Sequence, residues 1–302
     1  MTAARVGRAP AKVNLTLHVL ARRPDGYHEI ESLVTFASVG DRLSFIPDGS
    51  LSLIVLGPEA QACGDVFNNL VLKAARALAE RIEGLRLGLF LLSKRLPIAA
   101  GLGGGSSDAA AALRLLAHAN GLGPGDLRVW EAAKATGADV PVCLDPRARV
   151  MRGIGDVLSD PIALRPIPAV LVNPGVTLAT KDVFAAFDKA PERAPSCSSA
   201  QIQEQQIQEQ QERPEWVREG RLILSALAQD ANDLETSAIR LCPEIARILE
   251  ILRQQAGCEL ARMSGSGATC FGLFASRAAA SAAARSLRAA HPHWWVRATT
   301  LR

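Results

Sequence analysis

A glycine-rich loop between a strand-like segment and a helix-like segment constrains the fold of this chain more than any other feature. The apolar residues 85–92 are typical of a buried strand, and the alanine- and leucine-rich residues 107–119 are typical of a helix. Between them lies Gly101-Leu102-Gly103-Gly104-Gly105-Ser106-Ser107. Glycine lets the backbone approach a ligand closely, and the unpaired N–H groups at a helix N-terminus attract anions. The pattern predicts a phosphate-binding loop, with one of the serines capping the helix and Asp108 in its first turn.

Other functions of such a loop fit the residues less well. A P-loop needs a lysine after its last glycine, where this chain has Ser106. A dinucleotide-binding fingerprint that starts at Gly101 needs a glycine or alanine at the same position, which disfavours an NAD-dependent oxidoreductase. A flexible linker remains the structural alternative, although a linker is not expected between a strong strand and a strong helix.

Composition limits the remaining classes of protein. A length of 302 residues suggests two domains, and 48% hydrophobic with 21% charged residues is an ordinary globular balance. The net charge of +4 comes without a block of lysines or arginines, so no nucleic-acid partner is expected. Six scattered cysteines, with no C-x-x-C pair, disfavour a zinc site and indicate free thiols. With neither a signal-peptide core nor a membrane-length apolar run, we expect a cytoplasmic protein with no membrane partner.

Three polar residues outside the loop are candidates for chemistry. Lys12 and Asn14 alternate with apolar residues and therefore share one face of an expected strand, although a solvated face explains this pattern equally well. Asp139 lies among small and apolar residues. It is either a helix cap or a deliberately placed carboxylate, because burying an unpaired carboxylate is costly.

A tight turn near the N-terminus presents a second candidate region. Pro24-Asp25-Gly26 marks the turn, and Tyr27, the only tyrosine of the chain, and His28 follow it directly. An aromatic ring and an imidazole at this place can stack on and hydrogen-bond a base or a sugar. Packing of the loop itself is the alternative.

Periodicity and breakers predict the remaining elements. Strands are expected over residues 5–20 with an interruption at Pro10, and over 29–36, 41–47, 51–56, 167–172 and 294–299. Helices are expected over 70–82, 126–135, 180–188, 243–255 and 277–290, with another that begins at residues 232–235. A second small-residue loop, residues 261–269, is followed by a strand, and this alternation suggests a split β-α-β domain with an antiparallel sheet. We expect domains at 1–163 and 164–302, with a polar, glutamine-rich insert at about 191–213 that forms an exposed loop or a solvated helix.

Three separated stretches resemble, in order, the three motifs of the GHMP kinases. They are Lys12-Val13-Asn14-Leu15, residues 97–108 and Gly265-Ser266-Gly267-Ala268. The resemblance implies an α+β, two-domain fold. An N-terminal ribosomal-protein-S5-like nucleotide domain and a C-terminal ferredoxin-like split β-α-β domain would enclose the active site in the cleft between them. The stretches at residues 23–29 and 136–141 narrow the resemblance to kinases that phosphorylate a hydroxyl of a cytidine-diphosphate sugar alcohol.

The same resemblance implies roles for individual residues. Asp139 would be the general base and Lys12 its electrostatic partner, with ATP and Mg²⁺ as cofactors. Ser107 would help the phosphates and water to place Mg²⁺. The expected ATP contacts are Asn69, Leu70, Lys94, Pro97, Gly101, Gly103, Gly104, Gly105, Ser106 and Ser107. The expected contacts to the substrate are Asn14, Tyr27, His28, Phe184, Gly265, Ser266 and Gly267.

Two other functions stay open on the sequence. The first is a GHMP kinase for homoserine, mevalonate or a sugar, which the cytosine-site resemblance of Tyr27 and His28 disfavours. The second is a non-catalytic nucleotide-binding relative, which the presence of both Lys12 and Asp139 disfavours. In each case we expect a monomer or homodimer with a small-molecule substrate.

Overall fold

The computed structural model describes residues 4–47, 49–190 and 224–302. They form two compact units. Of these residues, the first unit contains 4–12, 37–47, 49–98 and 103–146, and the second contains 13–36, 99–102, 147–190 and 224–302. The polar insert expected at 191–213 lies outside the described residues, and the boundary expected at 163/164 stays a prediction.

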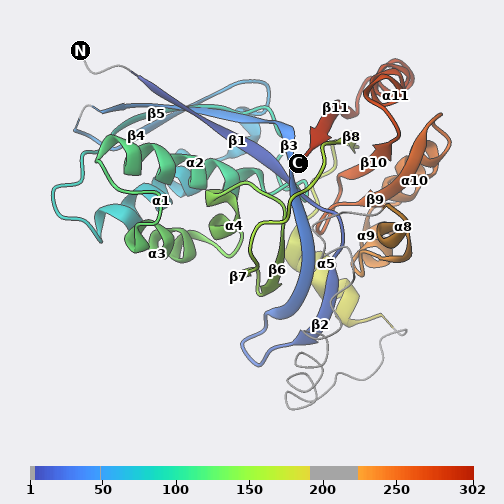
Figure 1. Ribbon diagram of the computed structural model, residues 1–302, viewed down its shortest axis with the longest axis horizontal. Coiled ribbons are helices and arrows are strands. Elements are labelled where there is room, and N and C mark those ends of the chain that lie inside the picture. Colours follow the sequence, from blue (N-terminus) through green and yellow to red (C-terminus); the bar gives the residue numbers. More distant parts are fainter. Residues whose placement is uncertain (1–3, 48, 191–223) are drawn as a thin grey trace. The chain divides into compact units, whose positions relative to one another are not determined.

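In the first unit, helices pack beside a small mixed sheet. Strand β4 (Ser52–Leu56) runs parallel to β5 (Gly88–Ser93), and β5 pairs antiparallel with residues 42–47 of β3 (His28–Pro47). Burial alternates along β5, as expected for a strand with one covered face. Figure 1 shows the helices grouped beside β4 and β5. They are α1 (Leu70–Ala79), α2 (Gly104–Ala119), α3 (Leu127–Thr136) and α4 (Val140–Leu144), with the 3-10 turns η1 (Gln61–Cys63) and η2 (Val66–Asn68) before them.

Helix α2 begins three residues earlier than the sequence pattern predicts. Its N-cap is Gly103, with φ of +57°, so the prediction that a serine caps this helix is wrong. The hydroxyl of Ser107 donates instead to the carbonyl of Pro10 at 2.7 Å. Asp108 consequently lies beyond the first turn, where its carboxylate contacts Lys94 rather than the helix N-terminus.

The second unit contains a four-stranded antiparallel sheet in the order β11-β8-β10-β9. Its strands are β8 (Ile167–Asn173), β9 (Cys258–Met263), β10 (Cys270–Phe274) and β11 (Trp295–Leu301). Helices α10 (Glu244–Arg253) and α11 (Arg277–Ala290) pack on this sheet (Figure 1). Their apolar residues form one buried core with those of β8 and β10. The α+β class expected from the sequence is confirmed.

A second group of elements in this unit surrounds the first half of β3. Strand β2 (His18–Arg22) and strand β6 (Arg149–Gly153) both pair antiparallel with it, and β7 (Val157–Leu158) pairs with β6. The other helices of this unit are α5 (Thr180–Asp188), α8 (Leu224–Gln229) and α9 (Glu235–Leu241).

Two predicted strand interruptions do not occur. Strand β1 (Arg5–Asn14) continues through Pro10, and β3 is one long strand where two were expected. Close packing explains why Gly40 does not break β3. A Cβ at Gly40 would lie 2.2 Å from the carbonyl oxygen of Ala9, so glycine is what allows the two strands to approach.

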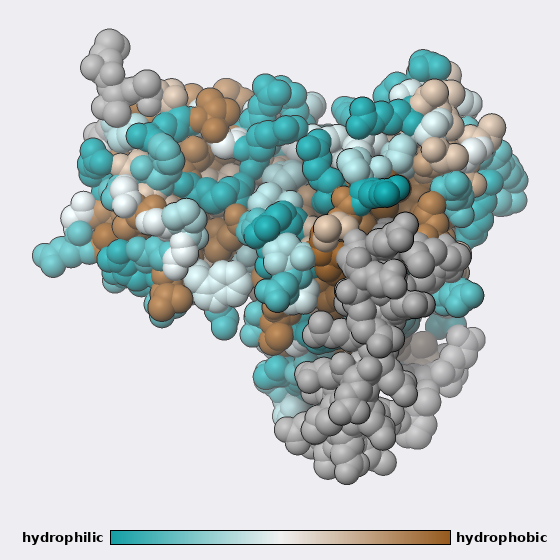
Figure 2. Space-filling view, in the orientation of Figure 1, coloured by the Kyte–Doolittle hydropathy of each residue, from teal (hydrophilic) through white to brown (hydrophobic). Residues whose placement is uncertain are grey.

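Hydrophilic side chains cover most of the described face in Figure 2, and apolar ones form smaller spots between them. Within the described ranges, no helix combines the length and the apolarity that a membrane crossing requires. The five described cysteines are free thiols, as expected.

Candidate active site

The centre of the candidate site in the first unit is an ion pair. Nζ of Lys12 lies 3.0 Å from Oδ2 of Asp139. The Lys12 side chain is only 4% exposed, so the explanation of its strand as a solvated face is wrong. Asp139 precedes α4 but makes no side-chain capping hydrogen bond, and its side chain is 37% exposed. Asp139 is therefore a carboxylate placed beside an ammonium group, and it remains open to solvent.

The glycine loop passes directly against this lysine. A Cβ at Gly103 would lie 3.0 Å from Cε of Lys12, and the φ of +57° favours glycine for a second reason. The N–H groups of the first turn of α2, at Gly104, Gly105 and Ser106, have no partner within the helix and can bind an anion. The ion pair and an anion site thus occur in the same unit, on adjoining residues.

Lys94 lies in a buried cluster of charged side chains just before the glycine loop. Its Nζ lies 2.6 Å from Oδ2 of Asp41 and 2.7 Å from Oδ2 of Asp108, and all three side chains are buried. Oδ1 of Asp41 accepts hydrogen bonds from the backbone N–H groups of Arg95 and Leu96, at 2.5 and 2.9 Å. This buried cluster fixes the chain before the glycine loop to the helix after it. Contact between Lys94 and ATP stays a prediction.

Within this cluster, the carboxyl group of Asp108 is almost completely enclosed, with 2% of the residue exposed. Burial raises the pKa of Asp108 to about 8, with Lys94 opposing the rise and Asp41 adding to it. Oδ1 of Asp108 is buried and has no hydrogen-bond partner among the described residues. Burial beside Lys94 and Asp41 thus favours the neutral form of Asp108 more than water would, since a second buried negative charge is costly.

The other expected ATP contacts in this unit lie on α1 and on the loop. Asn69 caps α1, since its Oδ1 accepts a hydrogen bond from the N–H of Val71 at 3.0 Å. Cδ1 of Leu70 lies 3.3 Å from where a Cβ of Gly105 would be, so this leucine approaches the loop. Ser106 and Pro97 are half-buried. Contact of these residues with ATP stays a prediction.

In the second unit, residues 99–102 of the same loop are fixed to a second glycine loop. Oγ of Ser264 donates to the carbonyl of Gly101 at 2.9 Å and accepts the N–H of Asn14 at 3.1 Å. A Cβ at Gly101 would lie 2.3 Å from the carbonyl oxygen of Ser264. Asn14 and Gly101 therefore both hydrogen-bond to Ser264, a residue that the sequence analysis did not single out.

The second glycine loop continues this arrangement. Gly265 and Gly267 have φ values of +56° and +84°, and Oγ of Ser266 lies 2.9 Å from Oγ1 of Thr180. A Cβ at Gly265 would approach Oδ1 of Asn14 to 3.3 Å. Of the expected substrate contacts, Asn14 and Gly265 are therefore neighbours, and Ser266 and Gly267 follow on the same loop.

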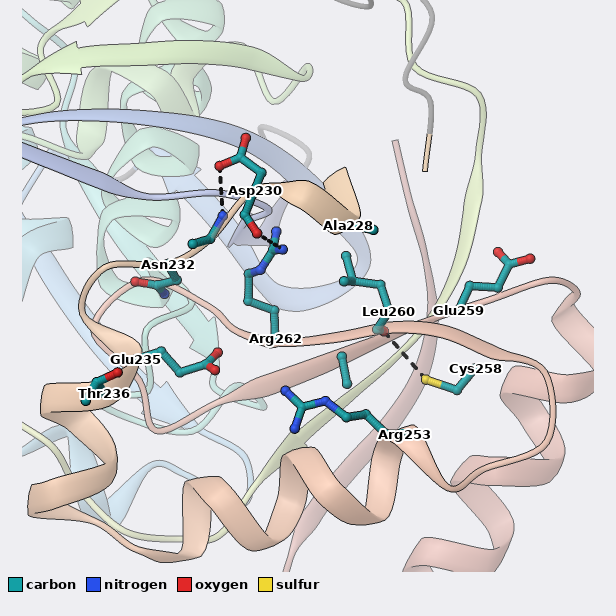
Figure 3. Close-up of a pocket in the computed structure, with 12 residues that line it drawn as sticks. Ala228, Asp230, Asn232, Glu235, Thr236, Arg253, Cys258, Glu259, Leu260 and Arg262 are labelled. Atoms are coloured by element: carbon teal, nitrogen blue, oxygen red, sulfur yellow. Dashed lines mark hydrogen bonds between the residues drawn. The ribbon is translucent and has the colours of Figure 1, made fainter. Parts of the chain in front are cut away.

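Three polar residues that the sequence analysis missed line a pocket next to this loop (Figure 3). Nδ2 of Asn232 donates to the carbonyls of Met263 and Gly265, at 2.9 and 2.8 Å. Oε2 of Glu235 accepts the N–H of Met263 at 2.9 Å. The guanidinium of Arg262 donates to backbone carbonyls of Leu15, Leu227 and Asp230, and burial lowers its pKa. These residues line a pocket of about 630 Å³, and no motif in the sequence indicates them.

Two of the three aromatic candidates lie together, His28 at the start of β3 and Phe184 on α5. The rings of His28 and Phe184 stack, with centroids 4.5 Å apart and planes at 23°. Nε2 of His28 lies 2.9 Å from Oδ1 of Asp188, another residue that the sequence analysis missed. Tyr27 is 59% exposed at the tip of the turn. Recognition of cytosine by these residues stays a prediction.

The described residues contain no group of three or more histidine, cysteine, aspartate or glutamate side chains that could hold a metal ion. Ser107 is buried, and its hydroxyl donates to Pro10. The contact of Ser107 with Mg²⁺ stays a prediction.

Comparison with known proteins gives consistent results. A family model described as the GHMP kinases N terminal domain matches residues 69–145, and one described as GHMP kinases C terminal matches residues 213–293. The 4-diphosphocytidyl-2-C-methyl-D-erythritol kinase of Methylobacterium radiotolerans is 54% identical over 98% of both chains. The kinase of the same name from Rhodopseudomonas palustris is 53% identical over 97% of this chain and 96% of its own.

Solved structures agree with these relatives. A crystal structure of 4-(cytidine 5'-diphospho)-2C-methyl-D-erythritol kinase is 36% identical, covers 99% of both chains and has a TM-score of 0.74. Mevalonate kinase of L. major is 20% identical with a TM-score of 0.66, covering 100% of this chain and 96% of its own, and this likeness concerns the fold alone.

Proposed function

The chain belongs to the GHMP kinases, and on this premise we propose that it phosphorylates the 2-hydroxyl of 4-diphosphocytidyl-2-C-methyl-D-erythritol. ATP would be the phosphoryl donor, and the products would be the 2-phosphate and ADP. The reaction belongs to the non-mevalonate route to isoprenoid precursors. Two water-soluble nucleotides as reactants suit the cytoplasmic location that the sequence suggests. The observation that carries this proposal is the ion pair of Lys12 and Asp139 beside the glycine loop.

The proposed mechanism assigns one step to each member of the pair. Asp139 accepts the proton of the 2-hydroxyl of the substrate. At the same time, the hydroxyl oxygen forms a bond to the γ-phosphorus of ATP, and the bond between this phosphorus and the bridging oxygen of ADP breaks. The Lys12 ammonium stabilises the negative charge that develops on the attacking oxygen. A tertiary alcohol scarcely ionises at neutral pH, so a positioned base is needed.

The loop and the second unit supply binding and orientation. The N–H groups at the start of α2 would hold the phosphates of ATP. His28, Phe184 and Tyr27 would hold the cytosine, while Asn14 and residues 265–267 would contact the rest of the substrate. Orientation is a large part of catalysis here, because phosphoryl transfer depends mainly on positioning and charge stabilisation.

Mg²⁺ would bind to this chain as a complex with ATP. With no carboxylate cluster among the described residues, the ion would be held by phosphates and water, with Ser107 as the candidate ligand that the family resemblance suggests. When bound, Mg²⁺ offsets phosphate charge.

An acceptor panel tests the proposal. The full chain is incubated with ATP, Mg²⁺ and one alcohol at a time: the cytidyl substrate, mevalonate, homoserine or galactose. We expect ADP release and a new phosphomonoester signal in ³¹P NMR with the cytidyl substrate alone. Turnover of mevalonate without turnover of the cytidyl substrate would assign the chain to another branch of the family. Binding of ATP without any turnover would favour a non-catalytic relative.

A further inference from the structure

A carboxylate at the end of α5 faces the ring that we propose as part of the cytosine site. Asp188 is the last residue of α5, and its Oδ1 lies 2.9 Å from Nε2 of His28. Its Oδ2 lies 3.5 Å from Nε of Arg22. Arg22 and His28 are cross-strand partners in the β2–β3 pairing, so both point to the same carboxylate. The side chains of Asp188 and His28 are 17% and 7% exposed.

We propose that Asp188 is a positioning residue that fixes the tautomer of His28 and thereby makes the site select cytosine over uracil. This inference rests on the proposed function. A carboxylate only accepts hydrogen bonds, so the atom of His28 that faces it must carry a proton. In a neutral imidazole, a proton at Nε2 leaves a lone pair at Nδ1.

That lone pair can distinguish the two pyrimidines. Nδ1 of His28 has no hydrogen-bond partner among the residues that the structure describes. Cytosine carries a 4-amino donor where uracil carries a 4-carbonyl acceptor. An acceptor at Nδ1 therefore forms a hydrogen bond with cytosine and faces a second acceptor with uracil.

Stacking with Phe184 holds the plane of the imidazole, and Asp188 holds its rotation within that plane. The centroid distance of 4.5 Å and the angle of 23° give the ring a defined face against Phe184. Both constraints come from α5, since Phe184 and Asp188 lie one turn apart on it. The orientation of His28 is thus fixed from a single helix.

Nitrogen NMR tests the tautomer directly. The full chain is labelled with ¹⁵N-histidine, and His28→Gln identifies the His28 signals among those of the five histidines. At pH 7.5 without ligand, we expect one protonated-type signal for Nε2 and one unprotonated-type signal for Nδ1. Asp188→Asn should shift this pattern toward a mixture of tautomers, because an amide can donate as well as accept. A proton at Nδ1 in the unmutated chain, whether alone or with one at Nε2, would overturn the proposal.

Selectivity is the second measurement. We expect kcat/KM for the cytidyl substrate, relative to its uridyl analogue, to fall roughly tenfold in Asp188→Asn, the effect of one hydrogen bond. The change should lie in KM for the cytidyl substrate, with KM for ATP unchanged, and Asp188→Glu should restore part of the preference. Asp182→Asn is the matched control, since Asp182 is exposed on the first turn of the same helix.

The outcomes separate this inference from the proposed function. If the unmutated chain fails to phosphorylate the cytidyl substrate, the proposed function is wrong, and the NMR pattern still decides the tautomer. If turnover occurs but Asp188→Asn keeps the full preference for cytidine, the role of Asp188 is wrong and the proposed function stands. A variant that does not fold leaves the tautomer of the unmutated chain as the deciding result.

Discussion

Replacing Asp139 by asparagine removes the proposed base and changes the volume of the side chain little. An amide cannot accept the hydroxyl proton, and general base catalysis contributes typically about 10²- to 10⁴-fold, so we expect kcat to fall by that factor. The change also leaves the buried Lys12 without its carboxylate. At 3.0 Å and an effective dielectric constant of about 20, the pair attracts by about 5.5 kcal/mol. Because Asp139 is 37% exposed, water screens the pair, and we expect a net loss of about 1–2 kcal/mol in stability.

Steady-state kinetics and urea unfolding measure the two effects separately. The dissociation constant of a non-hydrolysable ATP analogue should stay within about twofold of the original, since the phosphate loop is untouched. Glu83→Gln is the matched control, because Glu83 is an exposed carboxylate in the same unit. Lys12→Met and the double variant complete a cycle, in which we expect strong non-additivity because the two groups act together. A kcat for Asp139→Asn within threefold of the original would refute the role of Asp139 as base.

Three further predictions concern the loops and one ion pair. Gly103→Ala places a Cβ 3.0 Å from Cε of Lys12 at a φ of +57°, and we expect a loss of about 1–2 kcal/mol in urea unfolding with weaker binding of the ATP analogue. Ala99 is the one non-glycine residue with positive φ in the described part of the chain, at +48°, so Ala99→Gly should relieve about 1 kcal/mol of strain and raise the melting temperature. Hydrogen bonds to Asp230 and Asp233 raise the pKa of His18 to about 10. The protonated His18 therefore contributes its full stabilisation below pH 6.5, and this contribution is lost as the pH rises toward 10. In His18→Gln, the free energy of unfolding should fall less steeply over that pH range. An equally steep fall in the variant would contradict this assignment.

Local signals account for what the sequence predicted well. Alternation placed Lys12 on a strand, the glycine loop indicated that a helix follows it, and the family resemblance named Lys12 and Asp139 as partners, which lie 3.0 Å apart. The errors at Pro10 and at the helix cap have one cause. Contacts between distant residues overrode the local preferences for turns and caps. Gly40 packs against the carbonyl of Ala9, and the hydroxyl of Ser107 donates to the carbonyl of Pro10.

Long-range polar contacts were beyond local signals. Lys94 binds Asp41, 53 residues earlier, and Asp108, 14 residues later, and neither separation follows from a helical or strand period. The partners of Arg262 are backbone carbonyls, which every residue has, so the residue types at those positions do not indicate them. One usable signal existed. Arg262 is the single charged residue within the small-residue stretch 261–269, and a charge that is buried at such a place needs several acceptors.

The unequal exposure of the Lys12–Asp139 pair has a consequence for the whole reaction cycle. A base that takes a proton in each turnover must release it before the next substrate arrives. Asp139 keeps more than a third of its surface in contact with solvent, whereas Lys12 is enclosed. In the proposed mechanism, bulk water can therefore take the proton from the carboxyl group of Asp139 directly, with no relay of side chains.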